Sequence, residues 1–165
     1  MIADIGEWIA RDAIHQAASW PGSIKLALNL SPLQMRSERF VVALVQTIAA
    51  SGIPAERIEV EITETALLHD TAENVQTLHR LRDLGVRIAL DDFGTGYSSL
   101  NYLRKFPFDT IKIDRCFVED LMNRPDCQAI IRAVVSLANE LAMSTVAEGI
   151  ETQEQFDWLK QVGCT

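Results

Sequence analysis

The segment LRDLGVRIALDDFGTG, residues 81–96, decides how the chain is organised. It begins with the end of an amphipathic pattern that stops at Gly85 and continues into an apolar run at residues 86–90. Two aspartates and a glycine-rich turn follow. Glycine often lies just past a helix end, and a short apolar run between turn residues is typical of a buried strand. The segment therefore predicts a helix, a buried strand and an acidic loop in succession.

The same succession recurs on both sides of this segment. Strands are predicted at residues 24–30, 58–62, 86–90, 110–113 and 144–147, and helices at 4–19, 38–51, 71–84, 98–105, 126–142 and 152–161. Apolar strands that alternate with helices form parallel sheets covered by those helices. The fold class is therefore α/β, and the sheet is either open and doubly wound or closed as a barrel.

We favour a TIM-like (β/α) barrel that is incomplete at both ends. A full barrel takes about 250 residues, whereas this chain has 165 and starts on a predicted helix. The periodicity also predicts another strand beyond Thr165. No linker or low-complexity stretch interrupts residues 1–165, so we expect a single, partial domain.

Composition excludes several classes of function. A formal net charge of −8 argues against binding to long nucleic acid, which calls for a basic face. No apolar run is long enough for a membrane helix, and the N-terminus lacks the pattern of a signal peptide. The three cysteines form no CxxC pair, so neither a zinc site nor a disulfide framework is expected. A cytoplasmic location follows, although the parent protein could be anchored in a membrane.

Polar residues gather at one structural position, the carboxyl end of each predicted strand. They are Asn29, Glu61, Glu64, Asp91, Asp92, Lys112, Asp114, Glu148 and Glu151. In a parallel barrel these ends open on one face, where such enzymes carry out their chemistry. Several carboxylates cannot all stay ionised at close range without cations, and oxygen-rich sites suit Mg²⁺ or Mn²⁺.

Each of these residues also has a simpler explanation. Asn29 could cap a turn, Asp91 and Asp92 could belong to a turn before a helix, and Lys112 could lie on the surface of an edge strand. Their joint occurrence at five successive strand ends favours a site. Gly94 and Gly96 match neither a Rossmann nor a P-loop spacing. Backbone amides of this loop could receive a phosphate, but we interpret the glycines as a tight turn that directs both aspartates toward the site.

Five ordered motifs resemble the successive signatures of the EAL domain. They are Asn-Leu-Ser at 29–31, Glu-Ile-Thr-Glu at 61–64, Asp-Asp-Phe-Gly-Thr-Gly at 91–96, Lys-Ile-Asp at 112–114 and Ala-Glu-Gly-Ile-Glu at 147–151. The resemblance covers essentially the whole chain. It implies a cyclic di-GMP phosphodiesterase, a metal-dependent hydrolase of bacterial signalling that opens cyclic di-GMP to linear pGpG.

The resemblance also implies roles for individual residues. Two ions of Mg²⁺ or Mn²⁺ would be held by Asn29, Glu61, Asp91, Asp92 and Glu148. Lys112, with Glu148 and Asp92, would form the catalytic group, and Lys112 would orient the attacking water. Glu64 would brace the loop after its strand, and Asp114 and Glu151 would be supporting acids. A homodimer or oligomer, and sensory or GGDEF domains in the parent protein, are further expectations.

The sequence departs from the family in two places. The Glu-Ala-Leu motif of the first barrel strand does not occur, and the Gln-Gly pair of the last strand, expected after Thr165, is missing. We therefore expect the 165-residue chain to be inactive alone. A cyclic di-GMP sensor without turnover is the main competing hypothesis. Less favoured are a barrel enzyme of the enolase or aldolase kind, and a fragment that associates through unpaired strand edges.

Overall fold

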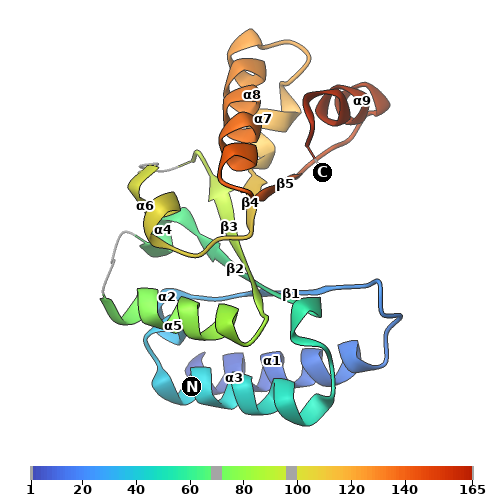
Figure 1. Ribbon diagram of the computed structural model, residues 1–165. Coiled ribbons are helices and arrows are strands. Elements are labelled where there is room, and N and C mark those ends of the chain that lie inside the picture. The colour runs from blue at the N-terminus through green and yellow to red at the C-terminus, as the bar shows by residue number, and fades with distance from the viewer. Residues whose placement is uncertain (1, 68–71, 96–99, 165) are drawn as a thin grey trace. The chain divides into compact units, whose positions relative to one another are not determined.

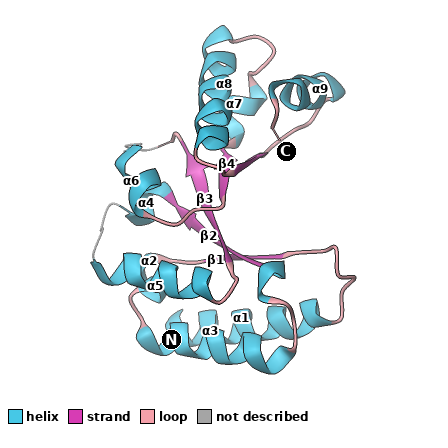
Figure 2. Ribbon diagram, in the orientation of Figure 1, coloured by secondary structure: helices cyan, strands magenta, loops and turns pink. Residues whose placement is uncertain are grey.

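The computed structural model describes residues 2–67, 72–95 and 100–164 (Figure 1). The elements are α1 Ile2–Ala18, β1 Leu26–Asn29, α2 Pro32–Met35, α3 Glu38–Ser51, the 3-10 turn η1 Ala55–Arg57, β2 Ile58–Thr63, α4 Glu64–Leu67, α5 Ala72–Asp83, β3 Arg87–Phe93, α6 Leu100–Lys105, β4 Thr110–Ile113, α7 Arg115–Glu119, α8 Pro125–Glu140, β5 Ser144–Ala147 and α9 Gln153–Val162. Strands alternate with helices throughout (Figure 2). The predicted α/β class is therefore confirmed.

The strands are parallel and follow the order β1-β2-β3-β4-β5. In the β1–β2 pair, Leu26 lies opposite Ile58 and Asn29 opposite Glu61. In the β4–β5 pair, Thr110 lies opposite Ser144. Sequence order equals spatial order, as in a barrel built from successive β/α units. This regular register brings the carboxyl ends of paired strands to the same edge.

The third strand is longer than predicted. Asp91 and Asp92 were expected to follow a strand that ended at residue 90, but β3 continues to Phe93. An irregularity between Leu90 and Phe93 shifts the register against β4, and Asp92 takes a left-handed conformation with φ 55°. A bulge of this kind lets the strand continue while it re-aims side chains. The two aspartates are thus part of the strand, and the bulge sets their directions.

The chain divides into two compact units, which we describe separately. Unit 1 contains residues 1–62, 66–88 and 100–107, and unit 2 contains residues 63–65, 89–99 and 108–165. Strand β3 is divided between them. In unit 1, α1 packs beside α3 and against β1 (Figure 1). Ser37 caps α3 by accepting from Phe40 N, and Gly52, with φ 71°, ends it, so that the helix has the bounds predicted for residues 38–51.

Unit 2 contains α7, α8 and α9 beside β4 and β5. One face of α8 is buried through Cys127, Ile131, Val134, Val135 and Ala138, which are spaced as an amphipathic helix requires. The short helix α7 was not predicted. Asp114 caps it by accepting from Cys116 N at 2.8 Å. The starts of the predicted helices at 71–84 and 98–105 lie outside the described residues.

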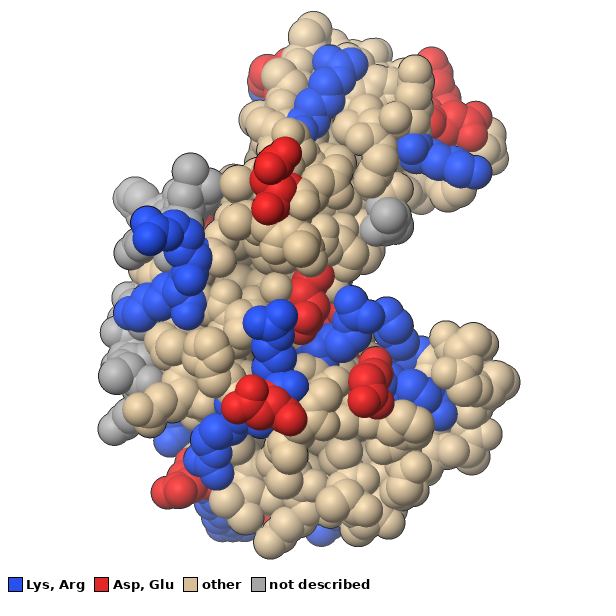
Figure 3. Space-filling model, in the orientation of Figure 1, with Lys and Arg blue, Asp and Glu red and all other residues tan. Residues whose placement is uncertain are grey.

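Two further observations concern membrane-spanning helices and the charged side chains of the surface. In the described ranges, no helix combines the length and apolar character needed to span a membrane. Basic and acidic side chains both occur on the visible face of each unit (Figure 3).

Candidate active site

The ammonium group of Lys112 lies at the centre of the candidate site in unit 2. Its Nζ is 3.1 Å from Asp91 Oδ1 and 2.6 Å from Glu148 Oε1. The Lys112 and Asp91 side chains are only 11% and 12% exposed, and that of Glu148 is 38% exposed. Three residues from three strands or strand ends therefore converge, as the sequence predicted. Because the Lys112 and Asp91 side chains are largely removed from water, their attraction is screened less than in a surface ion pair.

Asp92 adds a further acid to this cluster. Its backbone N–H donates to Asp91 Oδ1 at 3.1 Å. Burial raises the pKa of the Asp92 carboxyl, and the negative charges of Asp91, Asp114 and Glu148 raise it further, while Lys112 opposes them. Burial and three neighbouring acids therefore disfavour the charged form of Asp92 more than the ammonium group of Lys112 favours it. Such a cluster favours an added cation.

Asp114 has a structural role that the sequence did not reveal. Hydrogen bonds from the thiol and backbone N–H of Cys116 hold the pKa of the Asp114 carboxyl below its ordinary value. The carboxylate thus caps α7 and also contributes negative charge next to Asp92. Glu151, by contrast, is exposed, and its charge acts on Arg115. The structure therefore places Asp114 next to Asp92, and Glu151 near Arg115.

Glu64 connects two strand-end loops within unit 2. Its side chain is buried, and Oε2 accepts from Gly94 N at 3.2 Å. Gly94 has φ 95°, and a Cβ there would lie 2.9 Å from the Phe117 ring. Both the backbone conformation and the close ring require glycine at this position. The expected bracing role of Glu64 agrees with this bond, whereas Gly96 lies outside the described residues.

Asn29 and Glu61 belong to unit 1. They are opposite one another in the β1–β2 register. Glu61 is buried, and its backbone carbonyl accepts from Leu30 N at 2.8 Å, while Asn29 is exposed and lines a cavity of about 420 Å³. The structure thus brings an amide and a carboxylate together at one strand-end pair.

The donor atoms suit a hard divalent cation. Within the described ranges, no three His, Cys, Asp or Glu side chains are arranged so that they could hold a metal ion. Lys112 instead lies between Asp91 and Glu148, two of the predicted ligands. The predicted ligands offer only carboxylate and amide oxygens, which Mg²⁺ and Mn²⁺ prefer.

Sequence reasoning missed the contribution of α7. Phe117 contacts Gly94, and Arg115 lies so close to Gly149 that an added Cβ would be 2.7 Å from its Cγ. Both glycines flank predicted site residues. The signal was present, because an aspartate that directly follows a strand and precedes a mostly apolar segment is a typical helix cap. Asp114 could thus have indicated a helix against the site.

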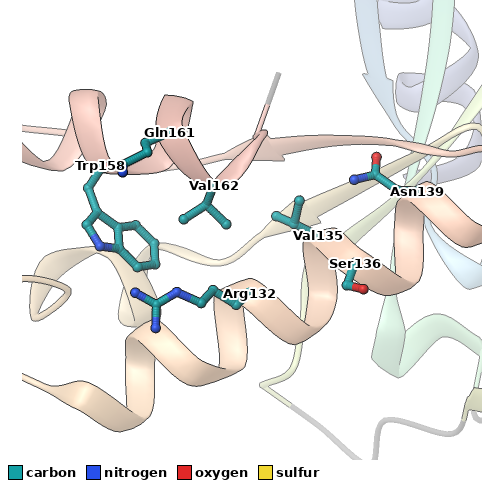
Figure 4. Close-up of a pocket in the computed structure, with 7 residues that line it drawn as sticks. All are labelled: Arg132, Val135, Ser136, Asn139, Trp158, Gln161 and Val162. Atoms are coloured by element: carbon teal, nitrogen blue, oxygen red, sulfur yellow. The ribbon is translucent and has the colours of Figure 1, made fainter.

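Another hollow in unit 2 lies between α8 and α9 and measures about 450 Å³ (Figure 4). The Arg132 guanidinium lies 5.1 Å from the ring centre of Trp158, as a cation–π pair. The lining contains none of the predicted site residues. We therefore place the candidate chemistry at the strand ends and not in this hollow.

The fold and the strand-end acids define a parallel α/β protein with a barrel-type site. The model of the EAL domain family matches residues 1–165, and the chain belongs to this family. An uncharacterized protein of Sinorhizobium fredii is 47% identical over 163 residues, which cover 99% of this chain and 20% of that protein. A cyclic di-GMP phosphodiesterase of Pseudomonas aeruginosa is 38% identical over 167 residues, covering 99% of this chain and 28% of the relative. The chain thus spans only a fifth to about a quarter of these relatives.

Solved structures agree with this assignment. The PaMucR phosphodiesterase in complex with c-di-GMP has a TM-score of 0.92 and 36% identity, covering 99% of this chain and 68% of the other. The manganese and cyclic di-GMP complex of Klebsiella pneumoniae BlrP1 has a TM-score of 0.89 and 33% identity, covering 98% and 42%. These neighbours place the fold among EAL barrel domains.

Proposed function

We propose that this chain provides the catalytic core of a phosphodiesterase that hydrolyses cyclic di-GMP to linear pGpG. The observation that carries the proposal is the position of Lys112 between Asp91 and Glu148, beside Asp92, in a chain of the EAL family. The similarity to relatives named cyclic di-GMP phosphodiesterases supports it. All 165 residues match the family, so we assign them to a single, partial EAL domain.

Lys112 is the residue best placed to act on the attacking water. Its ammonium group is held by two carboxylates from neighbouring strand ends, so its direction is fixed. From there it orients a water molecule or donates a hydrogen bond to the charge that develops on the phosphate oxygens. In the reaction the water oxygen forms a bond to phosphorus, and the bond to the ribose 3′ oxygen breaks.

Divalent cations complete the proposal. Asn29, Glu61, Asp91, Asp92 and Glu148 would hold two ions of Mg²⁺ or Mn²⁺. Bound cations lower the pKa of a coordinated water and neutralise the phosphodiester. Klebsiella pneumoniae BlrP1 has been solved with cyclic di-GMP in both calcium and manganese complexes, which supports a divalent ion. Glu64 and Asp114 support the ligands by fixing the Gly94 turn and the start of α7.

The proposal also covers the further domains of the whole protein, its oligomeric state and its location. The relatives are several times longer than this chain, which favours additional sensory or GGDEF domains in the whole protein. We further propose a homodimer or oligomer that acts in the cytoplasm.

The direct test is conversion of cyclic di-GMP to pGpG by the purified protein with Mn²⁺, followed by anion-exchange chromatography. Glu61→Ala provides the inactive comparison, and the 165-residue chain is measured beside a form extended at both ends. We expect pGpG from at least the extended form and none from Glu61→Ala. Binding by calorimetry in Ca²⁺ with no pGpG in Mn²⁺ from either form would favour a sensor instead.

A further inference from the structure

We propose that Gln155 is a positioning residue for the reaction, because it ties the loop that carries Glu148 to the helix that follows Lys112. This inference rests on the proposed function for its kinetic consequence. Gln155 lies in the first turn of α9, and its side chain is buried, with only 5% exposed. A buried amide at this place needs hydrogen-bond partners on both its nitrogen and its oxygen.

All of these partners are present, and they belong to two different segments. Gln155 Nε2 donates to Val118 O at 3.0 Å and to Glu119 O at 3.4 Å, both at the end of α7. Gln155 Oε1 accepts from Glu151 N and Thr152 N, each at 2.9 Å. Val118 O also accepts from Leu121 N at 3.2 Å, so the Gln155 amide adds a further bond to this helix end. The side chain therefore joins the end of α7 to the loop between β5 and α9.

Both joined segments lead directly to the site. Helix α7 starts at Arg115, three residues after Lys112, and the loop starts at Glu148. Gly149, next to Glu148, touches Arg115 so closely that a Cβ would lie 2.7 Å from Arg115 Cγ. The loop thus contacts α7 directly at Gly149, near the site. It is joined a second time, through the Gln155 side chain of α9, to the far end of α7. Movement of either segment would change the 2.6 Å contact between Lys112 and Glu148.

Capping of the α9 N-terminus alone does not account for all the hydrogen bonds of the Gln155 side chain. Gln155 also forms a capping box with Thr152, for which only the acceptor Oε1 is needed. The two bonds from Nε2 to α7 contribute nothing to that cap. Gln155→Glu separates the two functions, because glutamate is an ordinary capping-box residue. It keeps an acceptor for the cap but places a second oxygen against the carbonyls of Val118 and Glu119.

The test compares Gln155→Glu with Gln153→Glu, which makes the same chemical change on the exposed side of the same helix turn. Each variant is made in the form extended at both ends and purified, its folding is checked by circular dichroism, and kcat and KM for cyclic di-GMP are measured with Mn²⁺. A displacement of about 1 Å at a reacting group can lower the rate about 100-fold, so we expect kcat of Gln155→Glu to fall about 10- to 100-fold. KM should change by less than about threefold, because substrate contacts are kept. Gln153→Glu should match the wild type.

A measurement that does not depend on catalysis tests this inference separately from the proposed function. Backbone amide resonances of the ¹⁵N-labelled, metal-free protein should shift at Lys112 and Glu148 in Gln155→Glu but not in Gln153→Glu. A folded Gln155→Glu with wild-type kcat, or with unmoved resonances if the wild type is inactive, would overturn the positioning role. Should this variant fail to fold, neutral Gln155→Met of similar length replaces it, with the same expected loss.

Discussion

The ammonium nitrogen of Lys112 lies 2.6 Å from a carboxylate oxygen of Glu148, although 36 residues separate them in the chain (148 − 112). The β4–β5 register explains the contact, since Lys112 is opposite Val146 and the chain continues from there to Glu148. The backbone N–H of Glu148 also donates to Ile113 O at 3.1 Å. Parallel pairing therefore fixes both the backbone and the side chains of this pair.

Replacing Lys112 should remove most of the activity. Lys112→Met keeps the length of the side chain but loses the hydrogen-bond donors, and loss of one donor to a developing charge costs about 100- to 1000-fold in kcat. Lys160→Met, on the exposed side of α9, is the matched control and should be unaffected. Turnover of Lys112→Met within tenfold of the wild type would refute the assigned role.

Asp92→Asn should raise stability and lower activity in the same protein. The pKa of Asp92 is raised in the fold, so its contribution to stability is complete below the ordinary value of 3.8 and is lost as pH rises through the folded pKa. At pH 7, without metal, burial and the acidic neighbours thus both disfavour the charged form of Asp92, and asparagine also tolerates the left-handed backbone at this position.

Thermal unfolding of the metal-free protein between pH 4 and 8 checks this expectation. Asp92→Asn should unfold at a higher temperature than the wild type at pH 7, and the difference should shrink toward pH 4. Added Mn²⁺ should stabilise the wild type more than the variant. Glu154→Gln removes one exposed charge and serves as the control. An unchanged difference across the pH range would count against charge repulsion as the cause.

Glu64→Ala should loosen the Gly94 turn. The variant loses a charge-assisted hydrogen bond to Gly94 N–H and leaves a buried space, which should cost about 1–3 kcal/mol of unfolding free energy. Turnover should fall because Asp91 and Asp92 precede this turn. Urea unfolding measures the loss of unfolding free energy, and pGpG formation measures the loss of turnover. Glu154→Ala is the control for both. A variant as stable and as active as the wild type would show that the bond does not hold the turn.

The thiol of Cys116 should react slowly in the metal-free protein. Cys116 is exposed, but partial desolvation of its thiol, together with the hydrogen bond and charge of Asp114, raises its pKa to about 11. At pH 8 the thiolate fraction is then roughly 200-fold smaller than for an ordinary cysteine of pKa about 8.5. Alkylation by iodoacetamide, followed at this residue by mass spectrometry, measures the rate. Asp114→Asn should react faster, and equal rates in both proteins would exclude Asp114 as a cause.

The sequence predicted the site where local periodicity sets position. Asn29 and Glu61 were both expected at carboxyl strand ends, and the β1–β2 register places them opposite one another. The convergence of Asp91, Lys112 and Glu148 was expected for the same reason. A parallel sheet brings equivalent ends together, so approximate strand boundaries predict which of these residues lie near one another.

The remaining features depend on contacts that periodicity does not encode. The bulge at Asp92 arises from pairing between β3 and β4, and the length of the predicted strand gave no sign of it. Helix α7 has five residues, too short for a hydrophobic pattern to appear. The bonds from Gln155 to α7 join residues 36 and 37 positions apart, and only the tertiary structure brings those groups together.

The central claim is hydrolysis of cyclic di-GMP that requires the strand-end carboxylates to hold divalent cations. The most direct measurement is pGpG formation by the extended protein after removal of metal with EDTA and dialysis, before and after titration with Mn²⁺. We predict no product from the stripped protein, recovery as Mn²⁺ is added, and no recovery in Glu61→Ala. Undiminished pGpG formation by the stripped protein, or recovery by Glu61→Ala equal to that of the wild type, would contradict it.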